Sequence, residues 1–312
     1  MTGGLELVAL EGTNPLGFLA ALGVLDVLHR AGRAPTLHWT DDLVPTAVVR
    51  GAADRDDLVE LIDADRERWS TSPLLSWPPG EPLTDAKLRP AELRGWFEHV
   101  GHQLDDRRDA DLLIGLVAEG GLDNEGKAKP THLHFTAGQQ QFLSTVRELA
   151  AGVDGDRIRE ALFGPWRYDS TLKSLGWDSR GERLYALRAT DPSKETRRGI
   201  PGADWLAFLG LGFFPVAVVD GRVVTTACHP EWKRSAFRWP LWGRPADRAT
   251  TASLVADPEL VGDRRRRRLE GWRLHDRGIL RVLESPIRRS DQGGYGSFGA
   301  PTVLADALVG IG

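Results

Sequence analysis

The sequence predicts an α+β fold in which mixed sheet elements accompany buried helices, with an acidic, mainly helical insert. Segments with helical periodicity and segments with strand alternation follow one another without the regular strand–helix order of a doubly wound protein. The chain has 312 residues, of which 41% are hydrophobic and 27% charged, and this composition is typical of a folded protein. We expect residues 1–50 and 126–312 to form the α+β body and residues 51–125 to form the insert.

The N-terminal region combines a predicted strand with a clearly delimited helix. Residues 5–11 alternate in part between apolar and polar side chains, which favours a strand. Asn14 is a good helix N-cap, and Pro15 suits the first helical position because that position needs no backbone N–H. The helix should run to about Arg30 and end at Gly32. Its apolar residues leave little polar face, so we expect this helix to be buried.

Two short strands and the acidic insert are expected next. The pattern predicts strands over residues 37–39 and 46–49. Within the insert, residues near 55–68 and 91–104 are predicted to be helical, with a proline-rich loop between them. Because the insert is polar and acidic, we expect it to lie exposed on the surface.

A second helix start is indicated at Thr136. Thr136 can act as N-cap, and Phe135 before it can pack as a hydrophobic staple. Phe142 and Val146 then fall on one apolar face of the predicted helix. Further elements are predicted from periodicity as helices over 156–163 and 201–211, strands over 184–187 and 278–284, and a short C-terminal helix after the glycine-rich residues 293–299.

Residues 216–225 carry the strongest local signal in the chain. Two β-branched runs, Val216–Val219 and Arg222–Thr225, flank Asp220 and Gly221. An Asp-Gly pair supplies the positive φ angles that a two-residue hairpin turn needs. The sequence therefore predicts a β-hairpin here.

The formal net charge of −4 conceals an uneven distribution of charge. The balance is −12 over residues 1–125, +2 over residues 126–220 and +6 over residues 221–312. Such asymmetry indicates a polyanionic partner or a complementary protein surface. Ordinary fluctuation of charge along the chain is the alternative interpretation.

Several kinds of site are excluded or only weakly indicated. A single cysteine, Cys228, excludes an internal disulfide framework and a multi-cysteine metal site. Phosphate-binding loops, dinucleotide fingerprints and nucleophile elbows have no matching motif. His132 and His134 would share one face of a strand and could bind a metal together, but the sequence marks no third ligand nearby. We therefore expect no metal and no cofactor, and an inert thiol at Cys228 beside His229.

One loose constellation indicates catalysis. Metal-assisted phosphodiester cleavage needs at least two carboxylates to hold the ion, and often a lysine for the developing charge. Asp169, Lys173 and Asp178 supply these groups, but they lie in a glycine- and tryptophan-rich loop without strands that would bring them together. A metal-dependent nuclease is thus the alternative, and the main prediction has no catalytic residue.

The basic residues indicate a function more strongly. Guanidinium and ammonium groups bind phosphates, and aromatic rings beside cations are used to bind single-stranded nucleic acid. One basic group, Lys233, Arg234 and Arg238, is interleaved with the aromatic residues Trp232, Phe237, Trp239 and Trp242. The alternative interpretation is that these aromatic residues lie in the protein core. The predicted nucleic-acid-binding residues are Arg264, Arg265, Arg266, Arg267, Arg268, Lys233, Arg234, Arg238, Arg288, Arg289, Lys127, Lys129 and Lys173.

Four stretches resemble a known family, namely residues 14–23, 134–140, 202–208 and 237–242. They are similar to segments of CRISPR-associated proteins of the type I-U/I-G systems, the large-subunit-like members of the Cascade effector complex. The resemblance implies a non-catalytic subunit of an RNA-guided complex for antiviral defence, which engages target DNA and holds the opened strands. In such complexes base pairing with the guide reads most of the sequence, while protein reads duplex shape and a short flank.

The main hypothesis is therefore a nucleic-acid-binding subunit of a Cascade-like complex. Its basic C-terminal part would contact guide RNA or target DNA, and its acidic N-terminal part would face neighbouring protein subunits. The alternatives are the nuclease described above and a structural scaffold whose oppositely charged parts bind each other.

A cytoplasmic location is expected from the N-terminal residues. Glu6 and Glu11 stand where a signal peptide would carry lysine or arginine. The apolar run from Leu16 to Leu28 is too short to span a bilayer and contains Asp26, so we expect no membrane contact.

Overall fold

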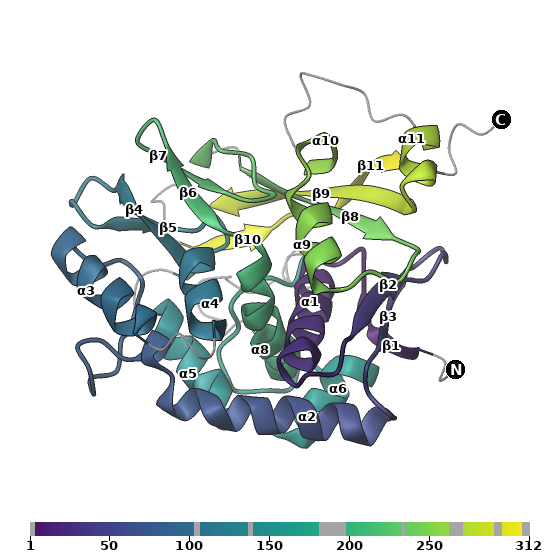
Figure 1. Ribbon diagram of the computed structural model, residues 1–312, viewed down its shortest axis with the longest axis horizontal. Coiled ribbons are helices and arrows are strands. Elements are labelled where there is room, and N and C mark those ends of the chain that lie inside the picture. Colours follow the sequence, from purple (N-terminus) through teal and green to yellow (C-terminus); the bar gives the residue numbers. More distant parts are fainter. Residues whose placement is uncertain are drawn as a thin grey trace, which may run out of the picture.

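The computed structural model has the α+β architecture that the sequence predicts (Figure 1). It describes residues 4–102, 107–136, 140–180, 198–232, 235–261, 271–289 and 295–307. Two antiparallel sheets of three and four strands accompany a central group of helices, and two hairpin-like strand pairs lie beside them. Among the described residues, none of the helices combines the length and apolar character that a bilayer-spanning segment requires.

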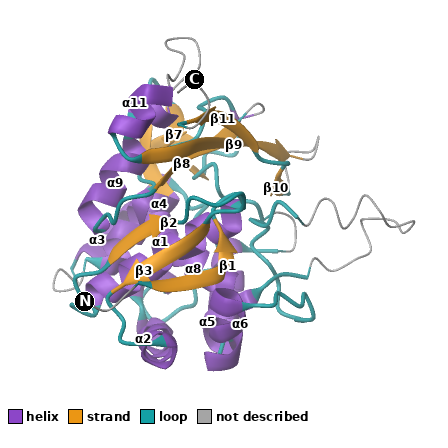
Figure 2. Cartoon of the chain, turned by 90° about the vertical axis from the view of Figure 1, so that its right-hand side faces the viewer, coloured by secondary structure: helices purple, strands orange, loops and turns teal. Residues whose placement is uncertain are grey.

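The three-stranded sheet contains the strands predicted in the N-terminal region. Its order is β1 (Leu5–Glu11), β3 (Thr46–Arg50) and β2 (Thr36–Trp39), all paired antiparallel (Figure 2). Leu7 lies opposite Ala47 and both side chains are buried, which places one face of this sheet against the core. The predicted strands are therefore confirmed.

The centre of the molecule is a pair of helices, α1 (Pro15–Arg30) and α8 (Pro201–Gly210), which lie side by side (Figure 1). Asn14 caps α1 by accepting a hydrogen bond from the Leu16 N–H at 3.2 Å, as its sequence predicts. Residues 15–28 and the whole of α8 are buried. A Cβ atom on Gly23 would lie 2.8 Å from the carbonyl carbon of Leu206, and closer still to its oxygen, so glycine is what allows this close approach.

The acidic segment 51–125 is not a surface insert. Its elements are α2 (Arg55–Glu67), the 3-10 helices Arg68–Thr71 and Pro73–Leu75, α3 (Pro90–Gly101), α4 (Arg108–Leu116) and β4 (Val117–Leu122), which pairs with β5 (Ala128–Pro130). The two predicted helices are present, while α4 was not predicted. Leu58, Ile62, Trp69, Trp96 and Leu113 are buried and belong to the same hydrophobic core as α1 and α8. The expected exposure was wrong because the apolar side of each helix packs into this core, and the acidic residues Asp65 and Asp109 are buried as well.

The helix predicted to start at Thr136 starts later. Helix α5 spans Phe142–Gly152, with Gln141 at the N-cap position, and α6 spans Gly155–Phe163 as predicted. Phe135 packs edge-on against Phe298 with ring centroids 4.9 Å apart, and its carbonyl accepts a hydrogen bond from the Gly296 N–H at 2.9 Å. This tertiary contact holds the backbone at Phe135 in a non-helical path, so Thr136 is not the N-cap.

The second sheet is organised around β9 (Ile279–Arg289). It pairs antiparallel with β8 (Ala236–Trp242), β10 (Gly296–Phe298) and β11 (Thr302–Asp306). The predicted C-terminal helix is wrong over residues 302–306, because this segment forms hydrogen-bonded strand pairs with β9. The strand predicted over residues 184–187 lies outside the described residues.

The predicted hairpin is confirmed as β6 (Val216–Val219) and β7 (Arg222–Thr225), with φ of 50° at Asp220 and 71° at Gly221. The apolar helix α8 is followed by the short 3-10 helix Leu211–Phe213, which leads into this hairpin. Three short helices, α9 (Arg248–Ala256), α10 (Pro258–Val261) and α11 (Gly271–Asp276), lie between β8 and β9 in the chain.

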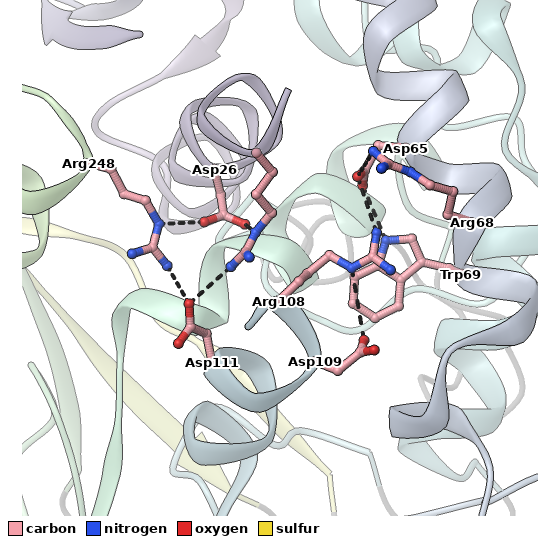
Figure 3. Close-up of polar contacts among 9 residues, drawn as sticks. Asp26, Asp65, Arg68, Trp69, Arg108, Asp109, Asp111 and Arg248 are labelled. Carbon is pink, nitrogen blue, oxygen red and sulfur yellow. Dashed lines mark hydrogen bonds and ion pairs between the residues drawn. The ribbon is translucent and has the colours of Figure 1, made fainter. Parts of the chain in front are cut away.

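Two networks of charge link helices of the molecule (Figure 3). The first joins the acidic segment to the rest: Asp26 on α1 and Asp111 on α4 each bind both Arg30 and Arg248, at distances of 2.6–3.0 Å. The second lies within the acidic segment, where the Asp65 carboxylate binds Arg68, Arg108 and the indole N–H of Trp69. Arg108 in turn lies 3.9 Å from Asp109. Because opposite charges alternate, each network is close to neutral. We interpret both as structural links between helices.

Candidate nucleic-acid interface

The predicted basic residues do not form one surface in the described part of the chain. The arginine run Arg264–Arg268 and the pair Lys233 and Arg234 lie outside the described residues. Arg288, which is among the predicted residues that the structure describes, is exposed on β9.

Three of the predicted cations are bound to carboxylates of the same molecule. Arg238 is buried and its Nε lies 2.6 Å from Glu284. Lys173 lies 2.9 Å from Glu148, and Lys127 lies 2.8 Å from Glu125. These salt bridges reduce the charge that each cation offers to a phosphate. The sequence cannot indicate the pairs of Arg238 and Lys173, because Glu284 and Glu148 are far away along the chain.

The remaining predicted cations, Lys129 and Arg289, meet at Trp232. The Nζ atom of Lys129 lies 4.4 Å from the centroid of the Trp232 ring, and Cζ of Arg289 lies 3.8 Å from it. The His132 ring is next to the same indole, with centroids 5.1 Å apart. We call Lys129, His132, Trp232 and Arg289 the Trp232 cluster.

Secondary structure brings these four side chains together from distant parts of the sequence. Lys129 is in β5, Arg289 is the last residue of β9, and Trp232 is in the loop between β7 and β8. Arg289 is fixed by donating hydrogen bonds to the carbonyl oxygens of His132 at 2.7 Å and His134 at 3.2 Å. The guanidinium is thereby held by neutral carbonyl groups, which do not neutralise its positive charge.

The charge of the cluster is uncompensated. Within the described part of the chain, neither Lys129 nor Arg289 forms an ion pair with a carboxylate. Burial lowers the pKa of Arg289 to about 10, and burial followed by repulsion from Arg289 lowers the pKa of Lys129, against the weaker attraction of Asp123. Arg289 is therefore still protonated at neutral pH. An anion placed here would relieve the repulsion between the two groups.

A pocket of about 340 Å³ adjoins the cluster. It lies between the loops around Trp232, β4 and the tip of the β6–β7 hairpin. The residues that line it are Gly121, Leu122, Lys129, His132, Gly221, Arg222, Val223, Pro230, Glu231 and Trp232. Arg222 adds a third cation, and Glu231 is an exposed carboxylate in the lining. The pocket is thus mainly basic, with apolar walls.

His132 lies in the lining of this pocket as a fixed, buried ring. Its Nδ1 is 3.0 Å from the hydroxyl of Thr225, and the Pro230 carbonyl acts as a hydrogen-bond acceptor for the ring. Burial, followed by the charge of Arg289, lowers the pKa of His132 to about 4, against the hydrogen bond with Pro230, so the ring is neutral at pH 7.

His132 and His134 do not share a metal site. They lie in a turn rather than a strand, and the ring of His134 binds Asp85 at 2.9 Å instead of facing His132. Burial acts to raise the pKa of Asp85, but the hydrogen bond and charge of His134 outweigh it, so the pKa is lowered. Within the described residues, no group of three or more His, Cys, Asp or Glu side chains could hold a metal ion.

The three residues of the nuclease alternative have separate partners. Asp169 binds Arg157 at 2.9 Å, and Lys173 binds Glu148 as described above. The Asp178 carboxylate accepts hydrogen bonds from Asn14 at 2.9 Å and from the Tyr168 hydroxyl at 2.7 Å. Within the described residues, the contacts of these three side chains therefore do not form the arrangement that binding an ion would need.

The other aromatic residues near Arg238 belong to the core. Phe237, Trp239 and Trp242 are fully buried, and the indole N–H groups of the two tryptophans donate to the carbonyls of Gly12 and Leu37. The protein core is thus the correct location for these three residues, whereas Trp232 is partly exposed. Cys228 is also buried, which raises the pKa of its thiol, as expected for an inert cysteine.

Sequence reasoning missed the roles of His132 and Arg222 in this site. His132 was considered only as a metal ligand, and Arg222 only as part of a hairpin. A cation next to a two-residue turn is a weak signal, because most such residues are solvated. Both roles depend on the approach of the β6–β7 hairpin to the Trp232 loop.

A scan against models of protein families finds no match for this chain, and a search of curated proteins finds none either. The resemblance to CRISPR-associated proteins therefore remains a prediction from the sequence.

Proposed function

We propose that the protein binds a nucleic acid at the Trp232 cluster, as a non-catalytic subunit of an RNA-guided, Cascade-like complex in the cytoplasm. The bound strand is guide RNA or target DNA. The neighbouring partners are protein subunits of the same complex.

A single observation carries this proposal. Within the described residues, Lys129 and Arg289 both contact the ring of Trp232 without a carboxylate partner, whereas three other predicted cations are each paired with a carboxylate. Uncompensated cations beside an aromatic ring are what proteins use to bind the phosphates and bases of single strands.

The test measures how binding depends on salt. Fluorescently labelled single-stranded RNA and DNA are titrated with the purified chain between 50 and about 300 mM salt, a range over which phosphate contacts lose affinity strongly. The Lys129→Gln variant should bind more weakly, and the slope of log affinity against log salt should fall by about 0.7 for the lost phosphate contact.

Lys127→Gln is the matched control. This lysine is two residues away, exposed and paired with Glu125, so its removal should change the slope much less. Equal effects of the two substitutions, or an unchanged slope in Lys129→Gln, would refute the proposed interface. Cleavage of the strand on addition of Mg²⁺, lost in Asp169→Ala, would instead support the nuclease alternative.

A further inference from the structure

The pocket beside the Trp232 cluster has more features than phosphate binding requires. Its volume of about 340 Å³ exceeds what a single phosphate group needs. Its lining includes the apolar side chains of Leu122, Val223 and Pro230 and the partly exposed indole of Trp232. An inorganic anion gains nothing from apolar groups, whereas a planar base does.

A second observation is that the indole of Trp232 is held in place. Its ring packs against the ring of His132, with centroids 5.1 Å apart. His132 is itself fixed, because its Nδ1 lies 3.0 Å from the Thr225 hydroxyl and the Pro230 carbonyl acts as a hydrogen-bond acceptor for its ring. A rigid, partly exposed indole is the kind of surface on which an unpaired base stacks.

The lining also carries charge. Lys129 and Arg222 line the pocket as cations, and Arg289 lies against the same indole as Lys129. The one carboxylate in the lining, Glu231, is exposed and its backbone N–H donates to the ring of His229 at 3.3 Å. The balance around the pocket remains positive, which favours a phosphate attached to the base.

We propose that this pocket takes one nucleotide of the bound strand, with the base against Trp232 and the phosphate at Lys129. The inference rests on the proposed function and deepens it, because a base can enter the pocket only when it is unpaired. The preferred ligand is then a single strand rather than a duplex. Backbone contacts at the Trp232 cluster would by themselves give no such preference.

The experiment uses mononucleotides as probes. Isothermal titration of the full chain with adenosine 5′-monophosphate, uridine 5′-monophosphate, adenosine, uridine and inorganic phosphate separates the contributions of base and phosphate. At least one nucleotide should bind about tenfold more tightly than its nucleoside, the ratio expected for a charge-assisted contact. It should also bind more tightly than inorganic phosphate.

Two variants separate the roles of the residues. Lys129→Gln should reduce the affinity ratio of nucleotide to nucleoside towards one. Trp232→Ala should lower the affinity for the nucleotide at least about fivefold, the lower range for losing an aromatic contact to a base. Urea unfolding of each variant shows whether it is folded, and Trp232→Phe serves if Trp232→Ala is not.

The outcomes distinguish this inference from the proposed function. If the nucleotides bind no better than inorganic phosphate, or if Trp232→Ala has no effect, the nucleotide pocket is refuted. Salt-dependent strand binding that is still sensitive to Lys129→Gln would then leave the proposed function intact. If strand binding is also insensitive to Lys129→Gln, both proposals fail.

Discussion

Replacing Gly23 by alanine tests whether the close contact of α1 and α8 organises the core. The new Cβ would lie 2.8 Å from the carbonyl carbon of Leu206 and closer to its oxygen, whereas Cβ atoms essentially never come within 3.0 Å of another atom. The obstacle is backbone in a fully buried helix, so no side chain can rotate away from it. The two helices would have to move apart.

The expected loss of stability combines two opposing contributions. Overpacking of a core site costs about 3 kcal/mol at the upper end of its usual range, and a rigid backbone obstacle places this site there. Alanine is a better helix former than glycine by about 1 kcal/mol, which offsets part of the cost. Gly23→Ala should therefore lower the free energy of unfolding by about 2 kcal/mol or more.

Urea unfolding followed by far-UV circular dichroism measures this change, with Gly101→Ala as control. Gly101 ends α3 and has no atom within 4 Å of the position of a new Cβ, so its replacement should be neutral or stabilising by up to about 1 kcal/mol. The two substitutions are chemically identical and should have opposite signs. A Gly23→Ala protein as stable as the Gly101→Ala protein would refute the packing argument.

Two further predictions concern buried charges. Asp26→Ala removes a buried carboxylate that binds two arginines and should lower the free energy of unfolding in urea by about 3 kcal/mol. Glu119→Ala breaks an exposed pair with Arg94 and should lower it by less than about 1 kcal/mol. Similar losses in the two variants would contradict this prediction. Burial raises the pKa of Asp204 to about 7, against hydrogen bonds from Ser174 and the Leu175 N–H and with some help from Asp178. Because the folded state holds this proton more tightly than the unfolded state, the contribution of Asp204 to stability is complete below about pH 4 and is lost as the pH rises to about 7. Stability relative to Asp204→Asn should thus fall by roughly 2–4 kcal/mol over this range, and a constant difference would contradict the shift.

Local signals in the sequence predicted much of the secondary structure. Helix α1 starts where Asn14 and Pro15 indicate, since N-capping involves only the first turn of the helix. The turn at Asp220 and Gly221 was equally predictable, because positive φ angles are a property of those residues. Thr136 had the same local signal as Asn14 but is not a cap, because the contact between Phe135 and Phe298 decides the backbone there.

The burial of the acidic segment shows a different limit of the sequence. Its charged residues suggested exposure, but Trp69 and Trp96 are buried in the common core. Composition averages over both faces of a helix, and only the packing of the other elements decides that one face is covered. In addition, buried charges such as Asp65 have arginine partners from distant segments, so their acidity does not imply contact with solvent.

By itself, the sequence determined the fold class, the buried central helices, the hairpin and a set of basic residues that includes Lys129 and Arg289. Which cations remain without a carboxylate was decided only by the tertiary structure. Lys127 and Lys129 look alike in the sequence, yet one is paired with Glu125 and the other lies against Trp232. The physical reason is that an ion pair requires contact within about 4 Å. Folding decides which group each lysine meets at that distance: Lys127 meets Glu125 two residues away, whereas Lys129 meets Trp232 from a distant part of the chain.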